Sequence, residues 1–226
     1  MLRAIVFDFD GVIADSEPLH FRAFRDVLAA SGVELTEHDY YTRYLGFDDL
    51  GAFNAIAAER GRAWSAADLA GLAARKAERM EALERDASVL FPGAAAAILR
   101  AAAAVPLAIA SGALGAEIRR VLDRADLTRY FSAIVSAEDT PAGKPAPDPY
   151  RRAVELLSAA AGDPVLQAAE CVAIEDSRWG IESARTAGLR TVGVTTSYAA
   201  GELSQADLVI ASLVDLDVAR LQRLLF

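Results

Sequence analysis

The chain has 226 residues, of which 54% are hydrophobic, and a formal net charge of −9 at pH 7. This length allows one large domain or two small ones, and the acidic excess argues against a nucleic acid or an anionic membrane as partner. A single cysteine, Cys171, excludes an internal disulfide, and no apolar run reaches the length of a membrane-spanning helix, so we expect a cytoplasmic protein.

The first predicted element is a buried strand from Arg3 to about Phe9, because this run is rich in Ile, Val and Phe. It is short and ends in acidic residues, which is unlike a signal peptide. Asp8 and Asp10 are followed by Gly11, and in an extended chain residues i and i+2 point to the same side. Two carboxylates in one place favour a bound divalent cation or a shared proton, whereas an ordinary turn after a strand would give them no chemical role.

The segment that follows is helical by pattern, and the next convincing strand begins only at Leu107. Ser16 followed by Pro18 is typical of a helix start, and Gly32 is typical of an end. Further helices are predicted over 36–44, from 48 or 49 to 61, and over 65–84. A crossover between parallel strands normally takes one helix, in a unit of about 30 residues. We therefore predict a helical domain over 15–84, inserted into a core domain formed by 1–14 and 85–226.

From residue 92 onward, predicted helices and strands alternate. The strands are 107–110, 133–136, 171–174, 190–194 and 208–210, and the helices are 92–103, 114–125, 149–160, 178–187 and 218–226. This alternation predicts an α/β fold, a Rossmann-like parallel sheet with helices on both faces. In such sheets, ligands bind beyond the carboxyl ends of the strands.

Polar side chains follow the first four predicted strands. They are Asp8 and Asp10, then Ser111 with Gly112, then Lys144 in a loop stiffened by three prolines, then Glu175 with Asp176. This inventory suits a phosphate and Mg²⁺, because carboxylates are the oxygen ligands that Mg²⁺ prefers, while a lysine, a hydroxyl and backbone N–H groups bind phosphate oxygens. Each group also has a structural alternative: a turn at Ser111, an exposed loop lysine, and a helix cap at Ser177. Cys171 and Trp179 are predicted to pack rather than to bind.

Together these segments resemble the four signature motifs of the haloacid dehalogenase-like (HAD) superfamily of phosphotransferases. The motifs are Asp8–Val12, Ser111, Lys144 in its proline-rich loop, and Glu175–Ile181. The resemblance is to the branch of phosphoglycolate phosphatases and β-phosphoglucomutases, which carry a helical cap after the first strand. It implies a Mg²⁺-dependent phosphatase that acts on a small phosphate ester, of the sugar phosphate or phosphoglycolate type.

The resemblance also implies roles for the site residues. Asp8 would be the nucleophile that forms an aspartyl-phosphate, and Asp10 would be the general acid and base. Ser111, Gly112 and Lys144 would hold the phosphoryl group. The Mg²⁺ ligands would come from Asp8, Asp10, Glu175 and Asp176. The acid at position 10 argues against the dehalogenases of the superfamily, which lack it.

By the same resemblance, residues 15–84 form a cap that closes over the site and selects the substrate. A loop around Gly46 would reach toward the substrate. His20 and Lys76 lie where β-phosphoglucomutase-like relatives place cap residues near the site. Core packing is the alternative for His20, and a solvated helix charge is the favoured alternative for Lys76.

Three functions remain open. A phosphatase is favoured over a β-phosphoglucomutase-like isomerase, because such mutases usually carry a lysine and an arginine where this chain has Leu45 and Asp49. They also tend to carry an asparagine near positions 114 and 115. A non-catalytic binding protein is the third alternative, and the intact set of site residues speaks against it. Nothing in the sequence demands more than a monomer.

Overall fold

The computed structural model describes residues 1–44, 47, 49–86, 89–160, 162 and 166–225. The chain splits into two compact units, one formed by Met1–Asp15 with Val89–Phe226 and the other by Ser16–Ser88. This division lies close to the predicted insertion over 15–84. The role of the second unit as a cap stays a prediction.

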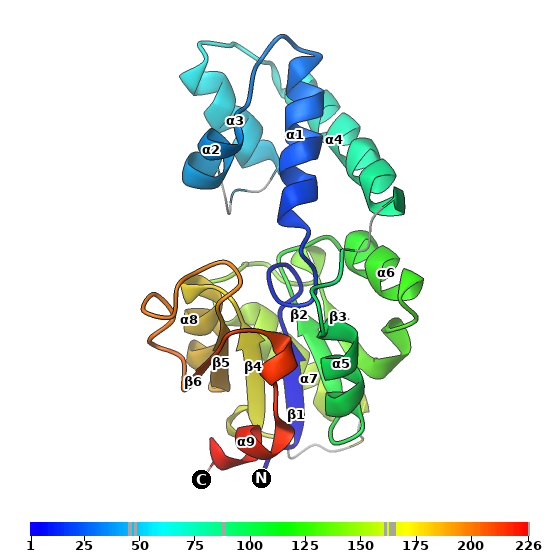
Figure 1. The fold of residues 1–226 in the computed structure, drawn as a ribbon, viewed down its shortest axis with the longest axis vertical. Coiled ribbons are helices and arrows are strands. Elements are labelled where there is room, and N and C mark those ends of the chain that lie inside the picture. The colour runs from blue at the N-terminus through cyan, green and yellow to red at the C-terminus, as the bar shows by residue number, and fades with distance from the viewer. Residues whose placement is uncertain (45–46, 48, 87–88, 161, 163–165, 226) are drawn as a thin grey trace. The chain divides into compact units, whose positions relative to one another are not determined.

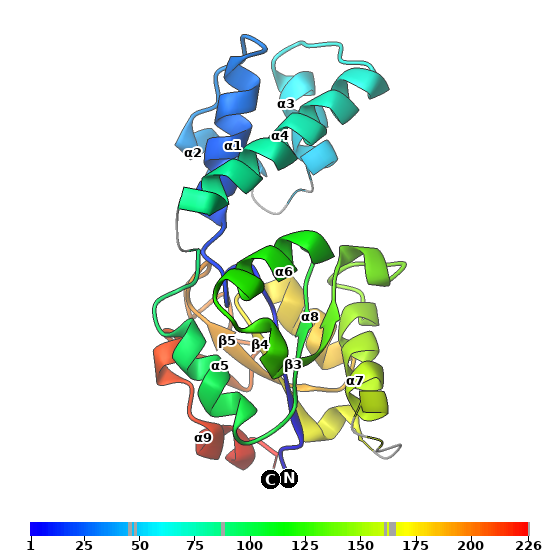
Figure 2. The same cartoon turned by 90° about the vertical axis from the view of Figure 1, so that its right-hand side faces the viewer.

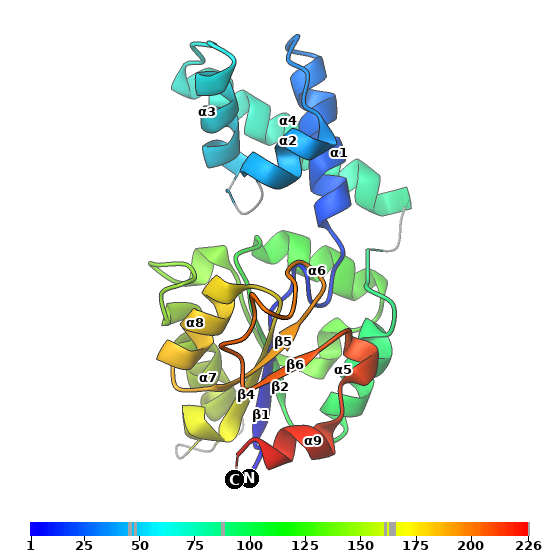
Figure 3. The same ribbon diagram turned by 60° about the vertical axis from the view of Figure 1, so that its left-hand side comes forward.

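The first unit, which we call the core unit, is built on a six-stranded parallel sheet with the order β3-β2-β1-β4-β5-β6 (Figure 1). The strands are β1 Ala4–Phe7, β2 Leu107–Ala110, β3 Phe131–Val135, β4 Cys171–Glu175, β5 Arg190–Val194 and β6 Leu208–Ile210. The helices are α5 Ala94–Ala102, α6 Gly115–Arg124, α7 Asp148–Ala160, α8 Arg178–Thr186 and α9 Val218–Arg223. Helices α7 and α8 lie on one face of the sheet, and α5 and α9 lie on the other (Figures 2 and 3). The predicted α/β fold with a Rossmann-like parallel sheet is confirmed.

The central strands are apolar throughout because helices cover both of their faces. All four residues of β1 and of β2 are buried. On the α7 side, Ala4 and Val6 belong to one apolar cluster with Tyr150 and Leu157. Cys171 packs in the same cluster, as predicted. Because these apolar strands are fixed in the core, the polar residues that directly follow them have fixed positions at the carboxyl edge of the sheet.

Trp179, at the start of α8, packs against neighbouring side chains and stays partly exposed. Its side chain keeps 39% exposure, and its ring packs edge-on against Tyr198. The guanidinium of Arg178 lies over the same ring, 4.3 Å from its centroid.

The second unit, which we call the helical unit, contains α1 Glu17–Ala29, α2 Glu37–Asp39, a π-helical turn Tyr40–Tyr44, α3 Asp49–Glu59 and α4 Ala66–Asp86. The single helix predicted over 36–44 is thus a short α-helix, capped by Thr36, followed by a π-helical turn. An aromatic core holds the unit together, with the rings of Phe24 and Phe53 4.9 Å apart. No helix in the described part of the chain is long and apolar enough to cross a membrane.

Candidate active site

The strand order brings the predicted site residues together at one edge of the sheet. Strand β1 lies between β2 and β4, and Phe7 pairs with Ile109 on one side and Ile174 on the other. In register, Asp8 therefore lies level with Glu175 on β4. The backbone hydrogen bonds between β1 and β4 continue for one residue past Phe7, because the Asp8 N–H donates to the Ile174 carbonyl at 2.9 Å. Three segments far apart in the sequence thus end side by side.

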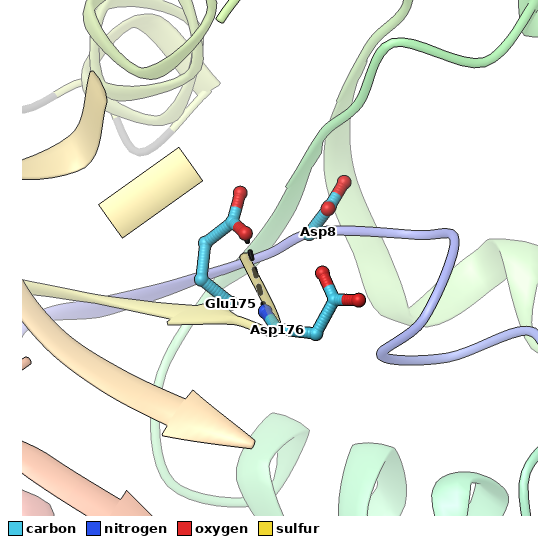
Figure 4. Close-up of side chains that lie close together, drawn as sticks. All are labelled: Asp8, Glu175 and Asp176. Carbon is cyan, nitrogen blue, oxygen red and sulfur yellow. Dashed lines mark hydrogen bonds between the residues drawn. The ribbon is translucent and has the colours of Figure 1, made fainter. Parts of the chain in front are cut away.

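Three buried carboxylates form the centre of the site: Asp8, Glu175 and Asp176 (Figure 4). Each offers one oxygen within 4.8 Å of the others. The ammonium group of Lys144 lies among them, with Nζ 2.8 Å from Asp8 Oδ1 and 2.5 Å from Glu175 Oε1. Three carboxylates share one ammonium group, so the cluster carries an excess of negative charge when all four groups are ionised.

This excess appears in the pKa values of the cluster. Burial, and then the charge of Glu175, raise the pKa of Asp8 well above its usual range, against the opposing effect of Lys144. Burial and Glu175 also raise the pKa of Asp176 to about 7. Burial disfavours the charged form of Lys144, but Asp8 and Glu175 outweigh it, and the pKa of Lys144 lies above its ordinary value. The lysine therefore stays charged, and the carboxylates compete for one cation.

The same residues fit a magnesium ion. Mg²⁺ prefers oxygen ligands, and carboxylates that crowd together without enough positive charge gain most from a divalent cation. The buried oxygens of Asp8 and Asp176, with the charge of Glu175 close beside them, supply both conditions. These buried carboxylate oxygens therefore support the predicted Mg²⁺ cofactor.

Two glycines allow the carboxylates to approach so closely. Gly11 has a φ of +74°, and a Cβ there would lie 1.9 Å from Asp176 Oδ2. At Gly180, a Cβ would lie 1.9 Å from the Glu175 carboxylate. Any side chain at either position would displace a carboxylate of the cluster. Both glycines belong to the sequence motifs, but the motifs alone give no reason for them.

Asp10 lies beyond the end of β1, in a tight turn. Strand β1 ends at Phe7, and the chain then turns tightly, with the N–H groups of Ile13 and Ala14 donating to the Phe9 carbonyl. Asp10 pairs through its backbone with Ala14 in this turn. Among the described residues, the set that brings ligand atoms within 4.8 Å does not include Asp10. Its catalytic and metal-binding roles stay predictions.

The predicted phosphate-binding residues follow β2. Ser111 is buried, its N–H donates to the Val135 carbonyl, and its Oγ accepts a hydrogen bond from the Ala113 N–H at 3.1 Å. Gly112 is exposed, and a Cβ there would have open space around it. The turn that is the structural alternative for Ser111 is therefore present. This turn does not test phosphate binding, so the phosphate-binding roles of Ser111 and Gly112 stay predictions.

The predicted cap residues lie in the helical unit, and Lys76 contradicts the favoured alternative. Its side chain is only 1% exposed, so it is not a solvated helix charge. Its Nζ donates to His20 Nδ1 at 2.8 Å and lies 2.8 Å from Asp49 Oδ1. Burial and then the charge of Lys76 lower the pKa of His20 to about 3, so the ring is neutral. Gly46, and Leu45 beside it, lie outside the described residues.

Sequence reasoning missed two residues that contact the site. The Tyr150 hydroxyl donates to Glu175 Oε1 at 2.7 Å from a fully buried position on α7. The Ser197 side chain hydrogen-bonds Asp176 from the loop after β5. Tyr150 follows the Lys144 loop and reads as an ordinary apolar helix residue, and Ser197 lies in a polar turn. Only the folded chain places them beside the carboxylates.

The chain is similar to known proteins over most of its length. The model of the haloacid dehalogenase-like hydrolases matches residues 2–188. Protein CbbY of Rhodobacter capsulatus is 34% identical over 218 residues, which are 91% of each chain. Hexitol phosphatase B of Escherichia coli K12 is 30% identical over 218 residues, or 95% of this chain and 94% of the relative. The crystal structure of CbbY from Rhodobacter sphaeroides in complex with phosphate has a TM-score of 0.85 and 27% identity, and covers 98% of this chain and 100% of that one.

This chain therefore belongs to the haloacid dehalogenase-like hydrolases. The predicted family and the predicted enzyme class are confirmed: the chain is a hydrolase of this family, and its named relatives include a phosphatase.

Proposed function

We propose that this chain is a Mg²⁺-dependent phosphatase that hydrolyses small phosphorylated metabolites of the sugar phosphate or phosphoglycolate type through an aspartyl-phosphate on Asp8. The observation that carries the proposal is the buried cluster in which Lys144 lies between Asp8 and Glu175, with Asp176 beside them. A lone cation beside a buried aspartate is suited to an anionic substrate that the aspartate attacks. A phosphate complex of a similar protein and a named hexitol phosphatase support the same substrate class.

The chemistry would proceed in two steps on the residues of this chain. In the first step, a carboxylate oxygen of Asp8 forms a bond to phosphorus, the bond to the leaving oxygen breaks, and Asp10 gives that oxygen its proton. In the second step, Asp10 takes a proton from water, the water oxygen attacks phosphorus, and the bond to Asp8 breaks, which releases phosphate. Lys144, Ser111 and the backbone at Gly112 would hold the phosphoryl oxygens throughout.

Asp8, Asp10 and Asp176 would hold Mg²⁺, with Glu175 beside them. When bound, Mg²⁺ neutralises negative charge on the phosphoryl group and keeps the carboxylates ionised at neutral pH. The raised pKa values of Asp8 and Asp176 support this assignment, since both result from burial next to other carboxylates. The helical unit would act as the cap that excludes water during the first step.

The test is phosphorus NMR of the purified protein with Mg²⁺ and a mixture of small phosphate esters that includes β-glucose 1-phosphate. Growth of the inorganic phosphate signal, absent in Asp8→Asn, would support the proposal and would name the esters consumed. Conversion of β-glucose 1-phosphate to the 6-phosphate without free phosphate would establish the mutase instead. No change in any signal would favour a non-catalytic binding protein.

A further inference from the structure

A buried tyrosine on α7 contacts the carboxylate cluster of the candidate active site. Tyr150 is 0% exposed and is the largest fully buried side chain in the described part of the chain. A buried phenol needs a hydrogen bond for its hydroxyl, and here the acceptor is Glu175 Oε1, 2.7 Å away. A phenylalanine would fill the same space without that need. The hydroxyl therefore serves Glu175 rather than the packing of the core.

The hydrogen bonds to Glu175 fix its carboxylate in one orientation. Oε1 accepts from Lys144 Nζ and from the Tyr150 hydroxyl. Oε2 accepts from the N–H groups of Asp176 and Ser177 and from the Ser177 hydroxyl, at 3.1–3.3 Å. Five donors surround two oxygens, which leaves this carboxylate little capacity for a metal ion and makes it a rigid anchor.

The anchor holds the lysine. Lys144 Nζ bridges Glu175 and Asp8, and the same ammonium group lies 5.2 Å from the centroid of the Tyr150 ring. Tyr150 thus acts on Lys144 twice, through a cation–π contact of its ring and through the carboxylate that its hydroxyl holds. The position of the lysine decides how much positive charge is presented to Asp8 and to a phosphoryl group beside it.

We propose that Tyr150 is a positioning residue for the phosphatase reaction: by occupying one side of Glu175 Oε1, its hydroxyl keeps Lys144 shared between Glu175 and Asp8. Without the hydroxyl, Glu175 Oε1 loses a donor and draws Lys144 toward itself, away from Asp8. The effect falls on the phosphoryl group during transfer rather than on metal binding. This inference rests on the proposed function and concerns a residue outside the four motifs.

The experiment compares Tyr150→Phe with the matched control Tyr130→Phe, whose hydroxyl accepts a hydrogen bond from Arg129 in the same unit. For an ester that the wild type hydrolyses, we expect kcat of Y150F to fall about tenfold with little change in KM, as for the loss of one hydrogen bond to a charged group. Inhibition by orthovanadate, which mimics the phosphoryl group in transfer, should weaken by a similar factor. The Mg²⁺ concentration for half-maximal rate should stay within about threefold of the wild-type value, a change of less than 1 kcal/mol.

A double-mutant cycle tests whether the effect passes through Glu175. E175Q alone should lower kcat and weaken vanadate inhibition, and the double variant Y150F/E175Q should be no slower than E175Q. If Y150F does not fold, E175Q, which keeps the size of the side chain, still tests whether Glu175 acts on Lys144 or on the metal ion. A Mg²⁺ half-saturation concentration that rises more than about tenfold, over 1.4 kcal/mol, in E175Q would make Glu175 a metal ligand and overturn the inference.

The outcomes separate the inference from the proposed function. A wild type that hydrolyses no ester would refute the function itself. If the wild type is active, three results for Y150F would refute only the role of Tyr150. They are an unchanged kcat, an unchanged inhibition by vanadate, and a loss of kcat that multiplies the loss caused by E175Q.

Discussion

Each of the two units of this chain holds one lysine against carboxylates, Lys76 buried and Lys144 partly buried, but they compensate its charge differently. In the core unit, Lys144 contacts Asp8 and Glu175, and Asp176 lies within the same cluster. In the helical unit, the described contacts of Lys76 are with one carboxylate, that of Asp49, and with a histidine.

The difference shows which cluster needs a further cation. The core cluster has more carboxylates than cations, and burial raises the pKa of Asp8 and Asp176 instead of stabilising their charges. Among the described residues, the helical cluster is balanced, with one cation, one anion and a neutral His20. A buried cluster with unequal numbers of positive and negative groups lowers the stability of the fold, and such clusters occur where a bound ligand supplies the missing charge. A pair of equal and opposite charges needs no ligand and can have a purely structural role.

The largest expected effect is on kcat, and it is tested by replacing the aspartate beside each lysine with asparagine. Asp8→Asn should reduce kcat at least about a thousandfold, because an amide cannot form the acyl-phosphate. Asp49→Asn, the matched change in the helical unit, should keep kcat within about tenfold of the wild-type value, since Asp49 takes no part in the chemical steps. Steady-state release of phosphate measures both. A normal rate in Asp8→Asn would remove the aspartyl-phosphate mechanism.

The second effect is the response to Mg²⁺. Because only the core cluster lacks positive charge, Mg²⁺ at a hundredfold excess over its Kd should stabilise the wild type by about 3 kcal/mol. Differential scanning calorimetry measures the rise in Tm. The rise should disappear in Asp176→Asn and persist in Asp15→Asn, where the aspartate is exposed. An equal rise in both variants would place the ion elsewhere.

A third, smaller effect separates the clusters by stability without Mg²⁺. Of the described partners of Lys76, Asp49→Asn leaves only the neutral His20. We expect the free energy of unfolding to fall by about 1–2 kcal/mol, a modest loss because Asp49 is partly exposed. Asp8→Asn removes one of three crowded carboxylates, and it should leave the free energy of unfolding unchanged or raise it. Urea denaturation measures both changes. A larger loss of unfolding free energy in Asp8→Asn than in Asp49→Asn would show that the core cluster has no excess of negative charge.

The sequence predicts most of this architecture because its signals are local or positional. Continuous apolar runs identify the strands, and the rule that ligands bind at the carboxyl ends of parallel strands brings Asp8, Lys144 and Asp176 to one place. The strand order β3-β2-β1-β4-β5-β6 then makes them neighbours.

What the sequence could not supply depends on side-chain contacts across the fold. A lysine on a long helix looks solvated, and only the packing of α1 against α4 shows that Lys76 is buried against His20. Tyr150 looks like one more apolar residue of α7, and its hydroxyl acquires a function only through Glu175 on β4. The alternation rule does not extend to Asp10, because β1 ends at Phe7 and Asp10 lies in the turn that follows.

The smallest expected effect is the pH dependence that His20 gives to the stability of the helical unit. The pKa of His20 is lowered to about 3 in the folded chain, against an ordinary value near 6.5, by burial and then by Lys76. The unfolded chain therefore binds the proton first, so the contribution of His20 to stability is complete above pH 6.5 and is lost as the pH falls toward 3. His20→Gln keeps an acceptor for Lys76 but does not titrate. Between pH 7.5 and 5.5, the wild type should lose about 1 kcal/mol of unfolding free energy relative to this variant.

Urea denaturation at the two pH values measures this difference, and His38→Gln is the matched control, because His38 is exposed. The control should show no such trend. Comparison with His20→Gln cancels the protonation of Asp8 and Asp176, whose raised pKa values act with the opposite sign and stabilise the folded core unit as the pH falls. A difference that stays constant with pH would mean that His20 titrates alike in the folded and unfolded chain, and the balance of the helical cluster would then need a second anion besides Asp49.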